Sequence, residues 1–163
     1  MLKKTLILIL SMLTTLTLTA CQSYSDMDIY ELIDALNNEY SYSFESDDFI
    51  IEKKESIIHH VMTDNNSLLS IYSNKKGTII QCTLSSFNTN NSDLFAYISK
   101  ILIKCDKKQI DSAIKSAVEY GSYEQNGWKI TIIKNDLGIT YILNHTNAEI
   151  NNNLKPTLKI TMN

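Results

Sequence analysis

Apolar residues recur at helical spacing in some parts of the chain and at every second position in others, and this alternation constrains the fold most strongly. Residues 26–40 carry apolar side chains every three to four positions, which predicts a helix capped by Asp26. From residue 48 the period becomes two, and polar turn segments separate the runs. The runs cover residues 49–51, 56–63, 68–73 and 78–85. We therefore expect the first helix to be followed by an antiparallel meander of four strands.

The second half of the chain also places helical patterns before strand patterns. Helices are predicted at residues 93–104 and 107–120, the second capped by Asp106 and ended by Gly121. A second group of strands accompanies the hairpin signal Asn126-Gly127. These strands are predicted at residues 128–134, 139–144 and 158–162. The order α-ββββ-α-α-βββ predicts the α+β class, a mostly antiparallel sheet with about three helices packed on one face.

A short sequence motif occurs at the end of the first and third predicted helices. The first helix ends in Glu39-Tyr40-Ser41-Tyr42, and the third ends in Glu119-Tyr120-Gly121-Ser122-Tyr123. An ancestral duplication of a helix-plus-meander unit would produce this similarity. A chance match between common residues would produce it equally well, and the sequence leaves both explanations open.

The N-terminus combines a short positive segment with an apolar stretch. Lys3 and Lys4 precede an apolar run over residues 5–18, which is too short and too interrupted by threonine to be a permanent membrane span. The run ends in Leu18-Thr19-Ala20-Cys21, a branched apolar residue and two small residues before a cysteine. An ordinary secretory signal or an uncleaved anchor leaves the small residues before the cysteine unexplained.

This ending resembles the lipobox of bacterial lipoproteins. The resemblance implies that a diacylglyceryl group is attached to the thiol of Cys21 and that a peptidase cleaves directly after Ala20. Acyl chains such as palmitate then hold the protein on the extracytoplasmic face of the cell membrane, because each buried CH₂ contributes about 0.8 kcal/mol. The implied organisation is a signal peptide at residues 1–20, a lipid anchor and short tether at 21–26, and one α+β domain at 27–163.

The charge balance argues against nucleic acid as a partner. All 15 basic residues are lysines, and removal of Lys3 and Lys4 with the signal peptide leaves 13 lysines against 18 acidic residues, a net charge of −5. Clustered basic residues make phosphate contacts, and arginine, which this chain lacks, makes the commonest specific contact with guanine. We expect attachment to the membrane through Cys21 and no binding of nucleic acid.

Two further cysteines and three histidines are the remaining candidates for a chemical site. Cys82 and Cys105 are either buried free thiols or a disulfide pair, and no C-x-x-C motif is present. His59 and His60 are neighbours on a predicted strand, so their side chains point to opposite faces and cannot share a metal ion. His145 lies at a strand end without a clustered carboxylate. We therefore predict no metal site.

The sequence contains none of the common catalytic or cofactor-binding motifs. The paired carboxylates Asp47 and Asp48 directly precede a strand, where turn chemistry explains them. No glycine-rich phosphate loop, G-x-S-x-G or H-E-x-x-H motif occurs in the sequence. We predict no cofactor and no catalytic residues, and the sequence gives no positive evidence of an enzyme.

Tyrosines at helix-to-strand junctions suggest a recognition surface. Large, amphipathic aromatic side chains are enriched at binding hot spots, and they also complete the rim of many cores. If the two halves are related by pseudosymmetry, the junction tyrosines would line equivalent edges of the sheet. The candidate interaction surface consists of Tyr40, Tyr42, Tyr120, Tyr123 and Trp128.

These patterns lead to one expected function and two alternatives. We expect a membrane-anchored lipoprotein that is not a catalyst and that binds an envelope protein or peptide near the membrane. The first alternative is a protein that binds a small molecule or cell-wall fragment in a pocket between the sheet and the helices. The second is an envelope hydrolase, which would need a polar cluster around His59 or His60.

Overall fold

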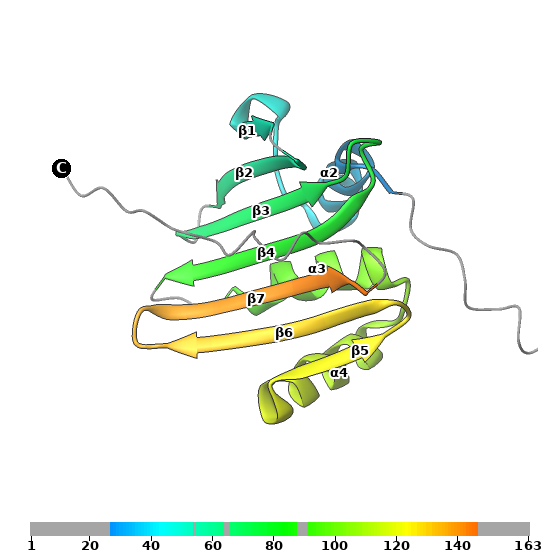
Figure 1. Cartoon of the computed structure of the whole chain (residues 1–163), viewed down its shortest axis with the longest axis vertical. Helices are drawn as coiled ribbons and strands as arrows, with labels where there is room; N and C mark the ends of the chain where they lie inside the picture. The colour runs from blue at the N-terminus through cyan, green and yellow to red at the C-terminus, as the bar shows by residue number, and fades with distance from the viewer. Residues whose placement is uncertain (1–26, 54, 64–65, 88–90, 147–163) are drawn as a thin grey trace, which may run out of the picture.

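The computed structural model describes residues 27–53, 55–63, 66–87 and 91–146, which form three α-helices and a seven-stranded antiparallel sheet (Figure 1). The helices are α2 (Ile29–Tyr40), α3 (Ser92–Ile103) and α4 (Lys107–Tyr120), and a 3₁₀ turn, η1, spans Ser46–Asp48. The strands are β1 (Ile50–Lys53), β2 (Ile57–Thr63), β3 (Ser67–Ser73), β4 (Ile79–Phe87), β5 (Ser122–Gln125), β6 (Trp128–Asn135) and β7 (Gly138–His145). The predicted α+β class and element order are confirmed.

The strand order in the sheet is β1-β2-β3-β4-β7-β6-β5. The first meander, β1 to β4, and the second, β5 to β7, are joined through the pairing of β4 with β7 at the centre of the sheet. The strands that follow α2 and α4, β1 and β5, therefore form the two edges among the described strands. This order is compatible with two related halves, and the duplication remains a prediction.

The helices lie together on one face of the sheet and build the core against it (Figure 1). The paired residues Ile71, Cys82, Leu143 and Ile130 form an apolar row across the four central strands β3, β4, β7 and β6. All four are fully buried. The helices contribute buried side chains at helical spacing, including Leu32, Leu36, Leu94, Phe95, Ile98 and Ile110. Burial of apolar area at about 25 cal/mol per Å² makes this face the main source of stability.

Local signals fix the ends of two helices. The side chain of Asp28 accepts a hydrogen bond from the backbone N–H of Glu31, so Asp28 caps α2, two residues after the predicted cap. Asp106 caps α4 as predicted, and Gly121 ends it with a φ of 82°. Predicted cap Asp26 lies outside the described residues.

The second group of strands begins earlier than the sequence predicts. The polar segment Ser122–Gln125 is a strand, β5, which pairs with β6 across a turn at Asn126-Gly127. Both turn residues have positive φ, as a tight hairpin requires. The strand predicted at residues 158–162 lies outside the described residues. Within the described residues, no helix is long and apolar enough to cross a membrane.

Candidate functional site

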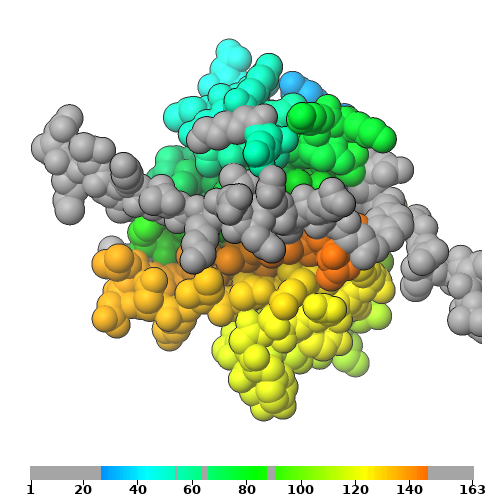
Figure 2. Space-filling model, in the orientation of Figure 1, coloured from blue at the N-terminus to red at the C-terminus, as the bar shows by residue number. Residues whose placement is uncertain are grey.

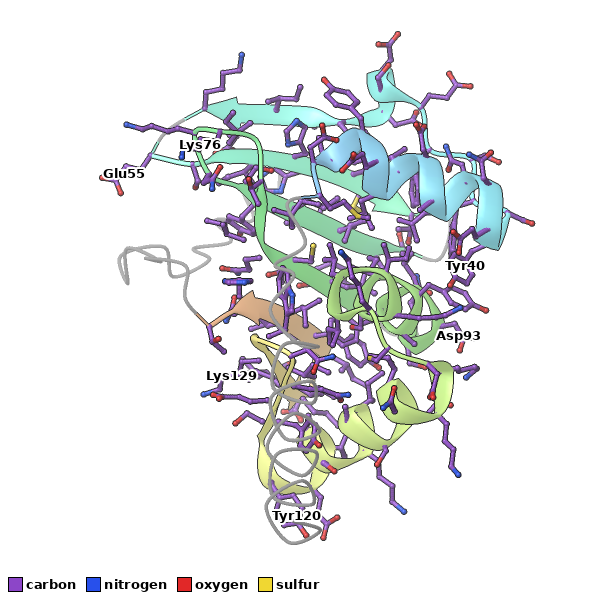
Figure 3. The ribbon with its side chains drawn as sticks, turned by 90° about the vertical axis from the view of Figure 1, so that its right-hand side faces the viewer. Tyr40, Glu55, Lys76, Asp93, Tyr120 and Lys129 are labelled. Atoms are coloured by element: carbon purple, nitrogen blue, oxygen red, sulfur yellow. The ribbon has the colours of Figure 1, made fainter. Side chains whose placement is uncertain are left out.

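The five residues of the predicted interaction surface do not form one surface. Tyr40 stacks on Tyr97 of α3 with ring centroids 4.1 Å apart, and Tyr42 meets the same ring edge-on at 6.4 Å. Tyr120 is 74% exposed at the far end of α4, well separated from Tyr40 (Figure 3), and Tyr123 is exposed on β5. The predicted surface is therefore corrected to two separate pairs of tyrosines, of which the first is packed against the core.

Trp128 belongs to neither pair because it is a core residue. It is only 2% exposed, and its ring meets His145 edge-on with centroids 5.0 Å apart. Trp128 is the first residue of β6 and shares the helix-facing side of that strand with Ile130, two positions later. Its assignment to an interaction surface is wrong, because its position after the hairpin turn orients it inward.

A chain of aromatic contacts runs from α3 to the first edge of the sheet. Beyond Tyr42, Phe44 stacks on the tyrosine ring at 5.4 Å, Phe49 follows at 6.2 Å, and His59 meets Phe49 edge-on at 6.3 Å. The side chain of Asn37 holds the same segment by donating to the carbonyl of Phe44 (2.8 Å) and accepting from its N–H (3.0 Å). These contacts fix the segment that leads into β1.

The two neighbouring histidines face opposite sides of the sheet, as predicted. His60 Nδ1 lies 2.8 Å from the hydroxyl of Ser70 on the neighbouring strand β3. His59 faces the helices, is 9% exposed, and its Nδ1 is buried without a hydrogen-bond partner. Burial lowers the pKa of His59 below its usual 6.5, and the nearby charges of His60 and Lys53 lower it further. The imidazole of His59 is therefore held neutral.

We expect stability to fall with acidification because of His59. Its folded-state pKa lies below the unfolded value of 6.5, so the stabilisation is complete above that pH and is lost as the pH falls through the folded pKa. Burial also lowers the pKa of His145, so this residue contributes to the loss of stability at low pH in the same direction. Urea midpoints measured between about pH 8 and pH 5 should decline in the native chain and decline less in His59→Phe. Equal pH dependence in both would contradict this assignment.

Two hollows flank β1, one on each face of the sheet. The inner hollow, about 480 Å³, lies between α2 and the sheet and is lined by Ile33, Asp34, Asp47, Ile51 and His59 among others. The outer hollow, about 520 Å³, lies on the other face and is lined by Asp48, Ile50, His60, Met62 and Leu68 among others. A smaller hollow of about 240 Å³ shares Ile51 and His59 with the inner one and extends to Lys53 and Lys76.

Exposed apolar side chains gather around the same strand. Ile50 is 71% exposed and Ile51 47%, while Tyr30 of α2 and Met62 of β2 are also more than half exposed. Tyr30 and Ile51 line the inner hollow, and Ile50 and Met62 line the outer one, so two of the four lie on each face of the sheet beside β1. We call Tyr30, Ile50, Ile51 and Met62 the β1 patch. A patch of this kind is typical of an interaction site.

The β1 patch was not predicted from the sequence. One signal was available, since Ile50 and Ile51 are adjacent and the side chains of neighbouring strand residues point to opposite faces. One of the two must therefore face away from the helices. Tyr30 and Met62 belong to the patch only because β1 lies at the edge of the sheet. The order of the strands is set by their pairing, which the sequence does not show.

The two cysteines of the described domain are free thiols. Cys82 is buried in the apolar row of the core, where burial strongly raises its pKa. Cys105 follows the end of α3 and is half-buried. The Cys82–Cys105 disulfide, one of the two alternatives, is therefore not formed, and Cys82 packs as a small apolar side chain.

Other polar candidates have structural partners. The carboxylate of Asp48 accepts a hydrogen bond from the N–H of Glu45 (2.8 Å) and closes η1, which agrees with the turn role expected for Asp47-Asp48. In the described parts of the chain, no three histidine, cysteine or acidic side chains are grouped to hold a metal ion.

Comparisons with known proteins give no family for this chain. No protein-family model matches it, and no match is found among the curated proteins or the solved structures. The candidate site therefore rests on the β1 patch and its two hollows.

Proposed function

We propose that this protein is a lipoprotein anchored through Cys21 on the extracytoplasmic face of the cell membrane, where it binds an envelope protein or peptide without catalysis. The anchor is supported by the lipobox-like segment Leu18-Thr19-Ala20-Cys21 after its charged and apolar leader. The tether predicted at residues 21–26 is short, and a flexible linker of n residues reaches about 5–6 Å × √n, so the domain lies close to the lipid headgroups. Partners at the membrane are therefore favoured.

The β1 patch is the observation that carries the binding proposal. Its four large apolar side chains surround an edge strand of the sheet, and hydrophobic residues exposed together at a sheet edge are a liability unless they serve an interaction. Because the patch follows a strand and is open to solvent, it suits a macromolecular partner. The acidic net charge of −5 after removal of residues 1–20, which contain Lys3 and Lys4, favours a basic partner.

The second candidate function is binding of a small molecule or cell-wall fragment in the inner hollow. Its volume of about 480 Å³ falls within the roughly 300–1,000 Å³ of ligand pockets. It lies between α2 and the sheet, and it combines apolar walls with His59 and two carboxylates, Asp34 and Asp47. A ligand of this class would raise the unfolding temperature of the protein without any envelope partner.

A hydrolase is less well supported than either binding function. His60 contacts the hydroxyl of Ser70, which is itself only 5% exposed, and among the described residues no carboxylate is hydrogen-bonded to His59 or His60. Nucleophilic catalysis by a serine needs a hydroxyl that the substrate can reach and a base held by a third group.

The lipid anchor is tested by Cys21→Ala in the full-length chain. We expect the native chain to incorporate labelled palmitate and to fractionate with membranes, and the variant to lose the label completely and to appear as soluble or unprocessed protein. Cys105→Ala is the matched control because it removes another thiol outside the proposed lipobox. Palmitate incorporation by Cys21→Ala would overturn the anchor.

The binding function is tested by cross-linking the anchored protein in its native membranes and recovering it, with Cys21→Ala as the comparison. We expect a reproducible envelope protein or peptide that is recovered with the anchored form only. Recovery of the bare protein from both forms would overturn this function in favour of the small-molecule alternative, which a thermal-shift screen of cell-wall fragments would then examine.

A further inference from the structure

We propose that the outer edge of β1 receives an extended, basic segment of the partner as an additional strand beside the seven described ones, with its side chains placed alternately in the inner and outer hollows. The inference rests on the proposed function, since it assumes a protein or peptide partner. It adds the recognition mode, the binding edge and the chemistry of the bound segment.

Among the described strands, β1 lies at an edge of the sheet. Among the described strands β1 pairs only with β2, and all four of its residues are exposed. Backbone N–H and C=O groups on the free side of an edge strand are available to another chain. β1 and β5 lie at opposite ends of the molecule (Figure 2).

The two edges differ in chemistry. β5, Ser122–Gln125, has one apolar aromatic residue among polar ones and directly follows α4, with which it is packed. β1 presents Ile50 and Ile51 side by side. Short length and charged or polar residues are means by which proteins protect sheet edges. β1 is short and ends in Glu52 and Lys53, but its first two positions are apolar and exposed. Of the two edges, β1 is the one suited to accept a strand.

The two hollows lie on opposite faces of the sheet beside β1. Ile51 pairs with His59 on the face that carries the helices, and Ile50 pairs with His60 on the opposite face. Successive side chains of a strand point to opposite faces, and neighbouring strands lie about 4.7–4.9 Å apart. A strand added beside β1 therefore presents alternate side chains toward the inner and outer hollows. Backbone pairing with pockets for alternate side chains is the pattern of β-strand addition.

The charge around the two hollows identifies the occupant as basic. Asp34 and Asp47 line the inner hollow and Asp48 lines the outer hollow. The smaller hollow carries Lys53 and Lys76 together with Asp28. The bound segment should therefore place a lysine or arginine near Asp34 and Asp47 and apolar side chains beyond it. Complementary charge of this kind fixes the register of a bound strand and speeds association.

The edge strand β1 is already held in position before a partner binds. Asn37 clamps Phe44 through two hydrogen bonds, and the stacked rings of Tyr42 and Phe44 continue to Phe49, directly before β1. Four residue pairs with β2 then fix the register of β1. β1 therefore needs little further ordering when a partner binds. This favours affinity, because the entropy lost in ordering loops and side chains opposes binding.

The test uses the anchored full-length protein in native membranes, with the photo-reactive residue p-benzoylphenylalanine replacing Ile50. The matched control carries it in place of Tyr123 on the opposite edge, which is also exposed. We expect position 50 to cross-link to an extended partner segment with alternating apolar residues and at least one lysine or arginine, identified by mass spectrometry. We expect Ile51→Lys, which adds a positive charge to the receiving edge, to reduce the cross-link about tenfold, the ratio that 1.4 kcal/mol represents.

A second measurement follows the protection of the backbone amides of β1. Amide hydrogen exchange in the presence of the identified segment, made as a synthetic peptide, should slow in Ile50–Lys53 and remain unchanged in Ser122–Gln125. Equal exchange of β1 with and without this peptide would overturn strand addition. The measurement also shows whether Ile51→Lys retains the native protection pattern, so that loss of binding is separated from loss of folding.

The outcomes separate this inference from the proposed function. A partner that cross-links at position 123 and not at position 50 would overturn strand addition at β1 while leaving the proposed function supported. A cross-link from position 50 to a second copy of this chain, or to an acidic segment, would overturn the basic occupant. Absence of a partner at both positions and in the whole-protein experiment would overturn the proposed function and, with it, the inference.

Discussion

Gly138→Ala is expected to lower the free energy of unfolding by roughly 2–5 kcal/mol, which combines positive-φ strain with overpacking. Gly138 begins β7 with a φ of 150° and pairs with Phe87 of β4. A Cβ atom at this position would overlap the backbone carbonyl oxygen of Ser86. Because backbone atoms cannot rotate away as a side chain can, the start of β7 would have to move from β4, and this is the pairing that joins the two meanders.

Gly77→Ala is the matched control for this prediction. Gly77 also has a positive φ, 90°, but a Cβ atom added there has no neighbour within 4 Å. Its substitution should cost only the backbone strain, about 1–2 kcal/mol. Urea denaturation followed by far-UV circular dichroism gives both values. Equal destabilisation by the two substitutions would show that strain alone, without the contact at Ser86, accounts for the need for glycine at position 138.

The elements of this fold follow from local sequence, and their order in the sheet does not. Helical spacing located α2, α3 and α4 to within a few residues, because a 3.6-residue period needs only neighbours in the chain. A two-residue period assigns side chains to faces and does not name the adjacent strand. The pairing of β4 with β7 therefore emerged only from the structure. The polar strand β5 lacks the apolar alternation by which strands are recognised.

The candidate site was less predictable than the elements. Tyr42 and Tyr123 both follow a helix, but Tyr42 meets the ring of Tyr97 on another helix, whereas Tyr123 lies exposed on β5. Which aromatic residue finds a partner is decided by contacts between elements far apart in the sequence. The same reason hid the β1 patch, since Ile50 and Met62 come from different strands and become neighbours through pairing.

The difference between a core and a surface aromatic residue gives the second large prediction. Trp128→Ala should lower the free energy of unfolding by about 3–5 kcal/mol, because it removes a fully buried indole and leaves a cavity beside His145. Tyr120→Ala, at a position that is 74% exposed, should change it by about 0.5 kcal/mol or less. Urea denaturation monitored by circular dichroism measures both free energies of unfolding. It does not depend on the fluorescence of Trp128, which the first variant lacks.

The same pair of variants shows whether Trp128 has any direct part in recognition. Where folded Trp128→Ala protein is present in the membrane at the native level, it should retain the partner cross-link from position 50, because the indole lies inside the core and the binding edge is formed by β1. A variant with native stability and no cross-link would instead place Trp128 in the interface. We expect Trp128→Ala to lose stability and to retain binding, because the indole packs in the core and does not contact the partner.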